Sequence, residues 1–158
     1  MNKFKTEIRW AFIFIIATIL WMVLEKAVGL HDVHIEKHPT YTMLYLIPAI
    51  LIYVFALRSK RIKDFGGIMT YKQGFITGLI MTAIVTIFSP LTQWVISEII
   101  TPDYFDTVIA YTVEHGMKSQ EEAEAYFNLK SYMIQSTIWS AVMGIVFSAI
   151  VAIFTRKS

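Results

Sequence analysis

Four long apolar stretches, separated by short polar segments, dominate the chain. They cover about residues 10–28, 41–57, 74–100 and 132–154. A helix needs roughly 20 apolar residues to cross a hydrocarbon core about 30 Å thick, and a helix satisfies its own backbone polar groups there. The pattern therefore predicts an all-α fold, a polytopic membrane four-helix bundle that forms one integral membrane domain over residues 1–158.

Two of the stretches contain proline, and the first ends like a secretory leader. Pro48 and Pro90 lie inside the second and third stretches. We interpret Pro90 as a kink, because neighbouring Thr and Ser side chains can satisfy the carbonyl that proline leaves free. Ala27-Val28-Gly29 offers the small residues of a signal-peptidase site. Glu25 and Lys26 directly precede it and argue against cleavage, so we expect the first span to be retained.

The composition supports a membrane protein and removes several kinds of chemistry. Hydrophobic residues make up 56% of the chain and charged residues 16%, with a mean hydropathy of +0.55. About a quarter of an ordinary globular chain is charged, so too little polar surface is left to cover a soluble core. The chain has no cysteine, which excludes disulfides, cysteine zinc sites and thiol catalysis.

The charged residues are distributed unequally between the two sides of the predicted bundle. Lys and Arg accumulate in the cytoplasmic segments of membrane proteins. We therefore predict that the N-terminus and the C-terminus are both cytoplasmic, while most acidic residues lie outside. Ten of the fourteen basic residues fall on the predicted inner side: Lys3, Lys5, Arg9, Arg58, Lys60, Arg61, Lys63, Lys72, Arg156 and Lys157.

The segment between the third and fourth spans predicts an extramembrane helical hairpin over about residues 102–131. Thr101-Pro102-Asp103 has the pattern of a helix start, and Gly116 that of a helix end. Ser119 and Glu122 have the spacing of a capping box, so a second helix should begin there and run into the fourth span. The hairpin is acidic. Its charges are interpreted as a solvated face, with cation or partner binding as the alternative.

Three of the four histidines lie close together in the loop after the first span. On a helix, His31, His34 and His38 would share one face, and Asp32 or Glu36 could add a carboxylate. Imidazole and carboxylate donors suit zinc, nickel or copper. The three histidines are therefore candidate metal ligands, with a pH-sensing cluster and ordinary interfacial loop chemistry as the alternatives.

Small and polar residues recur along the third and fourth spans. Such stripes allow helix backbones to approach closely, and amides at depth usually face the interior of a bundle. We predict that the two stripes face each other or a second copy of the protein. The candidate helix-packing or pore-lining residues are Gly78, Thr82, Thr86, Gln93, Gln135, Ser140, Gly144 and Ser148.

Taken together, these segments resemble the domain of unknown function 4199 proteins of Bacteroidota. The resemblance covers nearly the whole chain and implies a four-helix inner-membrane protein, but it carries no activity. It rests on Leu24-Glu25-Lys26, the stretch 31–38 ending at Pro39, Ile47-Pro48-Ala49-Ile50, the stretch 69–75, Ser89-Pro90-Leu91-Thr92-Gln93, Pro102-Asp103-Tyr104-Phe105 and the stretch 120–127.

No catalytic or cofactor motif is present: the sequence has no H-E-x-x-H, no G-x-S-x-G and no phosphate-binding glycine loop. We therefore predict a non-enzymatic protein of the bacterial inner membrane without a cofactor or a nucleic-acid partner. It would contact the lipid bilayer and act through helix packing, as an accessory or assembly subunit or as a homo-oligomer. The alternatives are a small-solute channel or transporter and, after these, a metal-dependent protein that uses the histidines.

Overall fold

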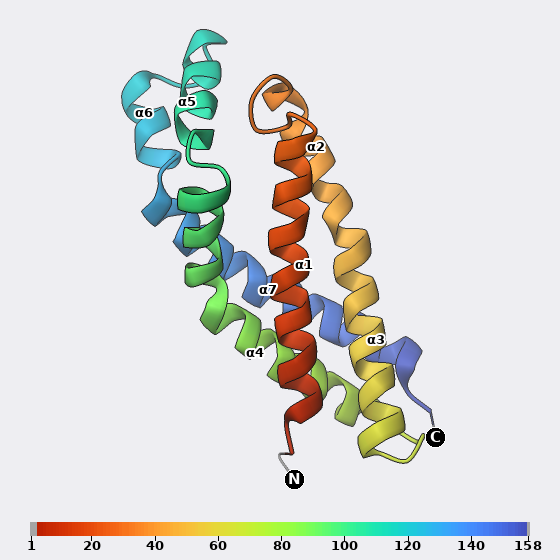
Figure 1. Cartoon of the computed structure of the whole chain (residues 1–158). Coiled ribbons are helices and arrows are strands. Elements are labelled where there is room, and N and C mark those ends of the chain that lie inside the picture. Colours follow the sequence, from red (N-terminus) through yellow and green to blue (C-terminus); the bar gives the residue numbers. More distant parts are fainter. Residues whose placement is uncertain (1–2, 158) are drawn as a thin grey trace.

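Four long helices form the structure, a computed structural model that describes residues 3–157 (Figure 1). They are α1 (Lys5–Ala27), α3 (Leu46–Asp64), α4 (Tyr71–Val95) and α7 (Leu129–Thr155). Each belongs to a segment long and apolar enough to cross a membrane. Within the described residues, the only strand-like pairing is one bridge between Met69 and Lys157. The predicted all-α bundle is confirmed.

The helices form two pairs that diverge toward one end of the molecule. In Figure 1, α4 and α7 run obliquely behind α1 and α3, which stand nearly upright. Both ends of the chain lie at the same end of the bundle, called the terminal end below. The opposite end is called the hairpin end, because it carries α5 (Tyr104–Glu114) and α6 (Gln120–Tyr126).

Short helical turns fill the hairpin end. Between α1 and α3 the chain forms the 3-10 turn η1 (Ile35–Lys37), α2 (His38–Tyr41) and the 3-10 turn η2 (Thr42–Tyr45). The helix α4 continues through Pro90 and ends in a π-helical turn, η3 (Ile96–Ile100). The predicted extramembrane hairpin between spans three and four is present as α5 and α6.

Two details of the hairpin differ from the expectation. The second hairpin helix does not run into the fourth span, because α6 ends at Tyr126 and Asn128 starts α7 by accepting a hydrogen bond from the Ser131 N–H at 2.9 Å. Thr101 does not cap α5, which begins only at Tyr104. Its hydroxyl instead donates to the Ile96 carbonyl at 3.0 Å and closes the π-helical turn. A Ser or Thr side chain can serve either the helix before it or the helix after it, and the sequence does not distinguish the two.

The small-residue stripes of α4 and α7 pack against each other within the chain. Gly78 lies against Ser148, and Gly144 lies against Thr82. The Thr82 hydroxyl also lies 2.8 Å from that of Tyr53 on α3, which joins the second helix pair to the first. The stripes thus hold one molecule together by close backbone approach.

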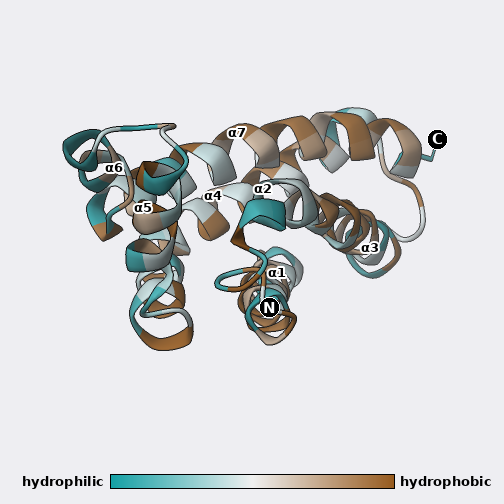
Figure 2. Cartoon of the chain, turned by 90° about the horizontal axis from the view of Figure 1, so that it is seen from above, coloured by the Kyte–Doolittle hydropathy of each residue, from teal (hydrophilic) through white to brown (hydrophobic). Residues whose placement is uncertain are grey.

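Apolar side chains both fill the core and cover the outside of the bundle. The core lies toward the terminal end, where Tyr53, Leu57, Met81 and Phe147 are buried. Figure 2 shows apolar residues along much of the long helices and polar residues on α2 and on parts of α5 and α6. Many large apolar side chains of the long helices are exposed, among them Ile16, Leu20, Ile138 and Phe154. This is the distribution expected of helices surrounded by lipid, with their hairpin outside it.

A buried ion-pair network fixes α1 to α3 at the terminal end. The Lys60 ammonium lies 2.9 Å from the Glu7 carboxylate and 2.9 Å from that of Asp64, and Lys60 and Glu7 are both buried. Thr6 donates to the same Asp64 carboxylate at 2.9 Å. The sequence pattern identified Lys60 only as a basic loop residue and did not indicate this network.

Candidate functional site

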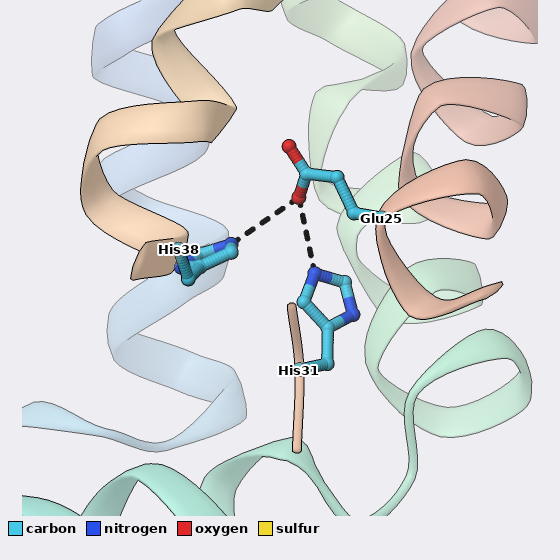
Figure 3. A group of neighbouring side chains, drawn as sticks. All are labelled: Glu25, His31 and His38. Atoms are coloured by element: carbon cyan, nitrogen blue, oxygen red, sulfur yellow. Dashed lines mark hydrogen bonds and ion pairs between the residues drawn. The ribbon is translucent and has the colours of Figure 1, made fainter. Parts of the chain in front are cut away.

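A carboxylate and two imidazoles meet at the hairpin end. Oε2 of Glu25 lies 3.1 Å from Nε2 of His31 and 3.3 Å from Nε2 of His38 (Figure 3). Glu25 and His31 are buried, and the His38 side chain is 18% exposed. These three residues are called the Glu25–His cluster below. Their ligand atoms all lie within 4.8 Å of one another.

A tight turn after α1 brings the three side chains together. Glu25 lies in the last turn of α1, and the chain reverses at Gly29, whose φ of +78° is readily adopted only by glycine. The Leu30 N–H donates to the Glu25 carbonyl at 2.9 Å, which fixes the path into His31. His38 then begins α2, so its ring approaches the same carboxylate from the other side.

Neighbouring side chains hold the cluster in place. The Trp21 indole N–H donates to the other Glu25 oxygen, Oε1, at 2.5 Å, and Thr42 makes a further side-chain hydrogen bond to this carboxylate. The Tyr104 ring on α5 packs against both imidazoles, with centroids 5.3 Å from His31 and 5.4 Å from His38. Burial raises the pKa of Tyr104, so this phenol stays protonated. Residues from α1, the turn after it, α2 and α5 therefore surround the cluster.

Only one of the two ring nitrogens of His31 takes part in this cluster. Nδ1 of His31 is buried and has no hydrogen-bond partner among the described residues.

The structure unites two of the three predicted histidines and adds a residue that the sequence did not indicate. His34 is not part of the group: its side chain is 48% exposed and faces Glu36 at 4.0 Å. Helical spacing suggested a shared face, but residues 31–34 form turns rather than a regular helix. In the sequence, Glu25 stands out only as a charged residue just before the small residues Ala27-Val28-Gly29. Only the turn at Gly29, which reverses the chain, brings it to the histidines.

A cavity of about 790 Å³ lies between the two helix pairs. It is called the side cavity below. Its floor lies at Tyr53, Val85 and Phe147, beside the buried core, and its lining extends to Thr42 and Tyr132 toward the hairpin end. Most of the lining is apolar, with hydroxyl and amide groups between: Thr18, Thr42, Tyr45, Ser89, Thr92, Gln93, Tyr126, Tyr132, Gln135, Ser136 and Ser140.

The predicted packing or pore-lining residues divide between this cavity and the α4–α7 interface. The side cavity is lined by Gln93, Gln135, Ser140 and Gly144. The interface contains Gly78, Thr82 and Ser148, and also Gly144, which packs against Thr82. Thr86 accepts a hydrogen bond from Ser140 at 3.3 Å. The two amides are engaged locally: Gln93 donates to Ser97 at 3.0 Å, and Gln135 donates to Ser131 at 2.9 Å.

The side cavity reaches the outside of the bundle at exposed lining residues. Two lining residues on its opposite walls are also exposed on the outside of the bundle, Met43 by 49% and Trp139 by 54%. The opposite side is closed by α1 against α4, where the rings of Phe12 and Phe88 pack 5.3 Å apart.

The fold and these sites define a multi-pass α-helical membrane protein with an internal side cavity and a polar cluster at one end. The chain belongs to the family described as protein of unknown function (DUF4199), which matches residues 9–157. No curated protein and no solved structure matches the chain.

Proposed function

We propose that this protein binds an amphipathic, lipid-like molecule in the side cavity and presents or carries it across part of the membrane. The observation that supports this most strongly is the cavity of about 790 Å³ inside the bundle. Sites for small molecules usually measure about 300–1,000 Å³ and are mostly apolar with a few polar groups. Ser136, Ser140 and Gln135 would supply such groups along one wall.

The closed floor favours a binding protein or carrier over an open pore. Tyr53 and Thr82 are hydrogen-bonded at 2.8 Å below the cavity, and Phe147 packs against the Tyr53 ring at 5.5 Å. A polar solute would have to displace this core to pass. The small-solute channel or transporter therefore needs a second, open conformation, whereas a lipid-like ligand can enter through the flank.

An accessory or assembly role remains a prediction that does not depend on the stripes. Gly78 and Gly144 are covered by Ser148 and Thr82 of the same chain. A membrane partner or a second copy would have to bind another face.

The location of the protein is a further part of the proposal. Both termini lie at one end of the bundle, and basic residues gather there. This supports a location in the bacterial inner membrane with both termini in the cytoplasm.

A photoactivatable phospholipid analogue with a crosslinker in its acyl chain tests the binding role. In the purified protein in nanodiscs, we expect crosslinks at lining residues such as Trp139 and Met143. Ser140→Phe fills the cavity and should lower this labelling about tenfold or more, the equivalent of about 1.4 kcal/mol in binding free energy.

Val142→Phe is the matched control, because Val142 lies on the same helix, is exposed, and does not line the cavity. Equal labelling of wild type, Ser140→Phe and Val142→Phe would mean that the label reports only bulk lipid, and the proposal would fail. Solute flux into liposomes that is abolished by Ser140→Phe would instead favour the transporter.

A further inference from the structure

We infer that the Glu25–His cluster is a binding site for a divalent transition metal, with zinc as its best-fitting ion. Its donors would be Oε2 of Glu25 and Nε2 of His31 and His38. This inference stands on the geometry of these three side chains alone. Its failure would leave the proposed binding of a ligand in the side cavity untouched.

Two of the three distances between the donors match those between the ligands of a tetrahedral ion. Zinc binds imidazole nitrogen and carboxylate oxygen at about 2.0–2.1 Å, so two ligands on a tetrahedron lie about 3.3 Å apart. The carboxylate oxygen lies 3.1 and 3.3 Å from the two imidazole nitrogens. The two imidazole nitrogens lie within 4.8 Å of each other.

The chemistry of the donors also fits. Neutral imidazole and carboxylate are ligands that zinc, copper and nickel accept, and the chain has no cysteine to compete. Both imidazoles present Nε2, which is the nitrogen that His uses in many metal sites. Three protein ligands leave a fourth position for water or another molecule, as in open zinc sites.

Several neighbouring side chains position the ligands, while Nδ1 of His31 has no hydrogen-bond partner among the described residues. Trp21 holds the second carboxylate oxygen, so Oε2 remains directed at the histidines. Such outer hydrogen bonds orient metal ligands and raise affinity. Tyr104 packs against both rings and limits their rotation. The partly exposed His38 gives an ion access from the hairpin end.

The test uses the full chain, purified in detergent without a histidine tag and stripped with a chelator. We expect Zn²⁺ to bind in a saturable way with one ion per chain, measured by competition with a chromophoric chelator. Co²⁺ should give the intense visible absorption of a tetrahedral complex. X-ray absorption of the zinc-loaded wild type should show two imidazole ligands and oxygen.

Matched variants separate this site from adventitious histidines. His31→Gln and His38→Gln should weaken Zn²⁺ binding by more than tenfold, whereas His34→Gln, in the same loop but outside the group, should bind like wild type. Trp21→Phe should weaken it about 10–100-fold, the usual effect of an outer-shell partner.

The inference is overturned if the wild type shows no saturable Zn²⁺ binding, or if its X-ray absorption shows fewer than two imidazoles. It is also overturned if His34→Gln loses as much affinity as His31→Gln and His38→Gln. Because His31 is buried, circular dichroism of each variant checks that it is folded. X-ray absorption of the wild type tests the two imidazole ligands even if a variant does not fold.

Discussion

At the scale of residues, two glycines determine how closely α4 and α7 can approach. A Cβ atom at Gly78 would lie 2.6 Å from Cβ of Ser148, and one at Gly144 would lie 2.9 Å from Cβ of Thr82. Real side chains do not tolerate such contacts, so any larger residue must push the two helix backbones apart. The Thr82 hydroxyl would move with them and disturb its contact with Tyr53 at the floor of the side cavity.

Gly78→Ala and Gly144→Ala should therefore each destabilise the protein by about 1–3 kcal/mol, the usual cost of overpacking a core.

Gly74→Ala is the control in the same stripe. Its new Cβ would meet the flexible end of Met69 at 3.1 Å and Cβ of Ala152 at 3.3 Å. Its steric cost should be offset by the roughly 1 kcal/mol that Ala gains over Gly in a helix. Unfolding in mixed detergent micelles, followed by circular dichroism, measures all three, and equal effects at all three would contradict the prediction.

Metal binding by the Glu25–His cluster also belongs to the residue scale, and it shows where sequence reasoning stops. The types of the ligands were visible, because three histidines within eight residues are unusual in an apolar chain. Their partner was not, since Glu25 belongs to a different element. The conformation of the chain after Gly29 directs His34 away from Glu25, while His31 and His38 face it. Periodicity describes regular helices and says little about such a turn.

At the scale of elements, the ion-pair network at the terminal end joins α1 to α3 in a way that hydrophobic packing alone does not. Lys60→Met should destabilise the protein by about 3 kcal/mol or more, because it leaves the buried Glu7 carboxylate without its partner. Lys63→Met, on the exposed neighbouring turn, is the control and should change stability little.

The double variant Glu7→Gln with Lys60→Met tests the cause of that loss. It removes both charges, so it should be more stable than Lys60→Met alone, as measured by the same detergent unfolding. If the double variant is no more stable than the single one, the loss came from packing of the Lys60 side chain and not from an unpaired charge.

The capping box of α6 makes this helix sensitive to acid. The backbone N–H of Ser119 donates to the Glu122 carboxylate at 2.9 Å, and this bond lowers the pKa of Glu122. A carboxyl whose pKa is lower in the folded state contributes its stability above its unfolded pKa, near 4.3 for Glu, and loses it as the pH falls through the folded value.

Hydrogen-exchange protection of the α6 amides should therefore fall toward acid pH. Glu122→Gln keeps a capping side chain but cannot titrate, so its protection should depend less on pH. The amides of α7 serve as an internal reference. A fall in protection that is identical in wild type and Glu122→Gln would show that another group is responsible.

At the scale of the whole molecule, the features that come from local patterns were predictable and those that come from long-range contacts were not. The four helices, the capping box at Ser119 and the facing stripes of α4 and α7 follow from periodicity within single segments. The side cavity arises because the two helix pairs diverge, and no pattern within one helix encodes that angle. The network around Lys60 likewise joins residues far apart along the chain.

The orientation in the membrane is the last property of the whole molecule that an experiment can test directly. Because the chain has no cysteine, single cysteines introduced at exposed positions report the side on which they lie. Lys5→Cys and Lys63→Cys mark the terminal end, and Glu114→Cys and Glu121→Cys mark the hairpin end.

Because basic residues gather at the terminal end, we predict that this end faces the cytoplasm. In right-side-out membrane vesicles, a membrane-impermeant maleimide should thus label Glu114→Cys and Glu121→Cys, and label Lys5→Cys and Lys63→Cys only after the membrane is permeabilised. Inverted vesicles should give the opposite pattern. The reverse result would place the hairpin end, with the Glu25–His cluster, on the cytoplasmic side, so that the cluster would take its metal from the cytoplasm.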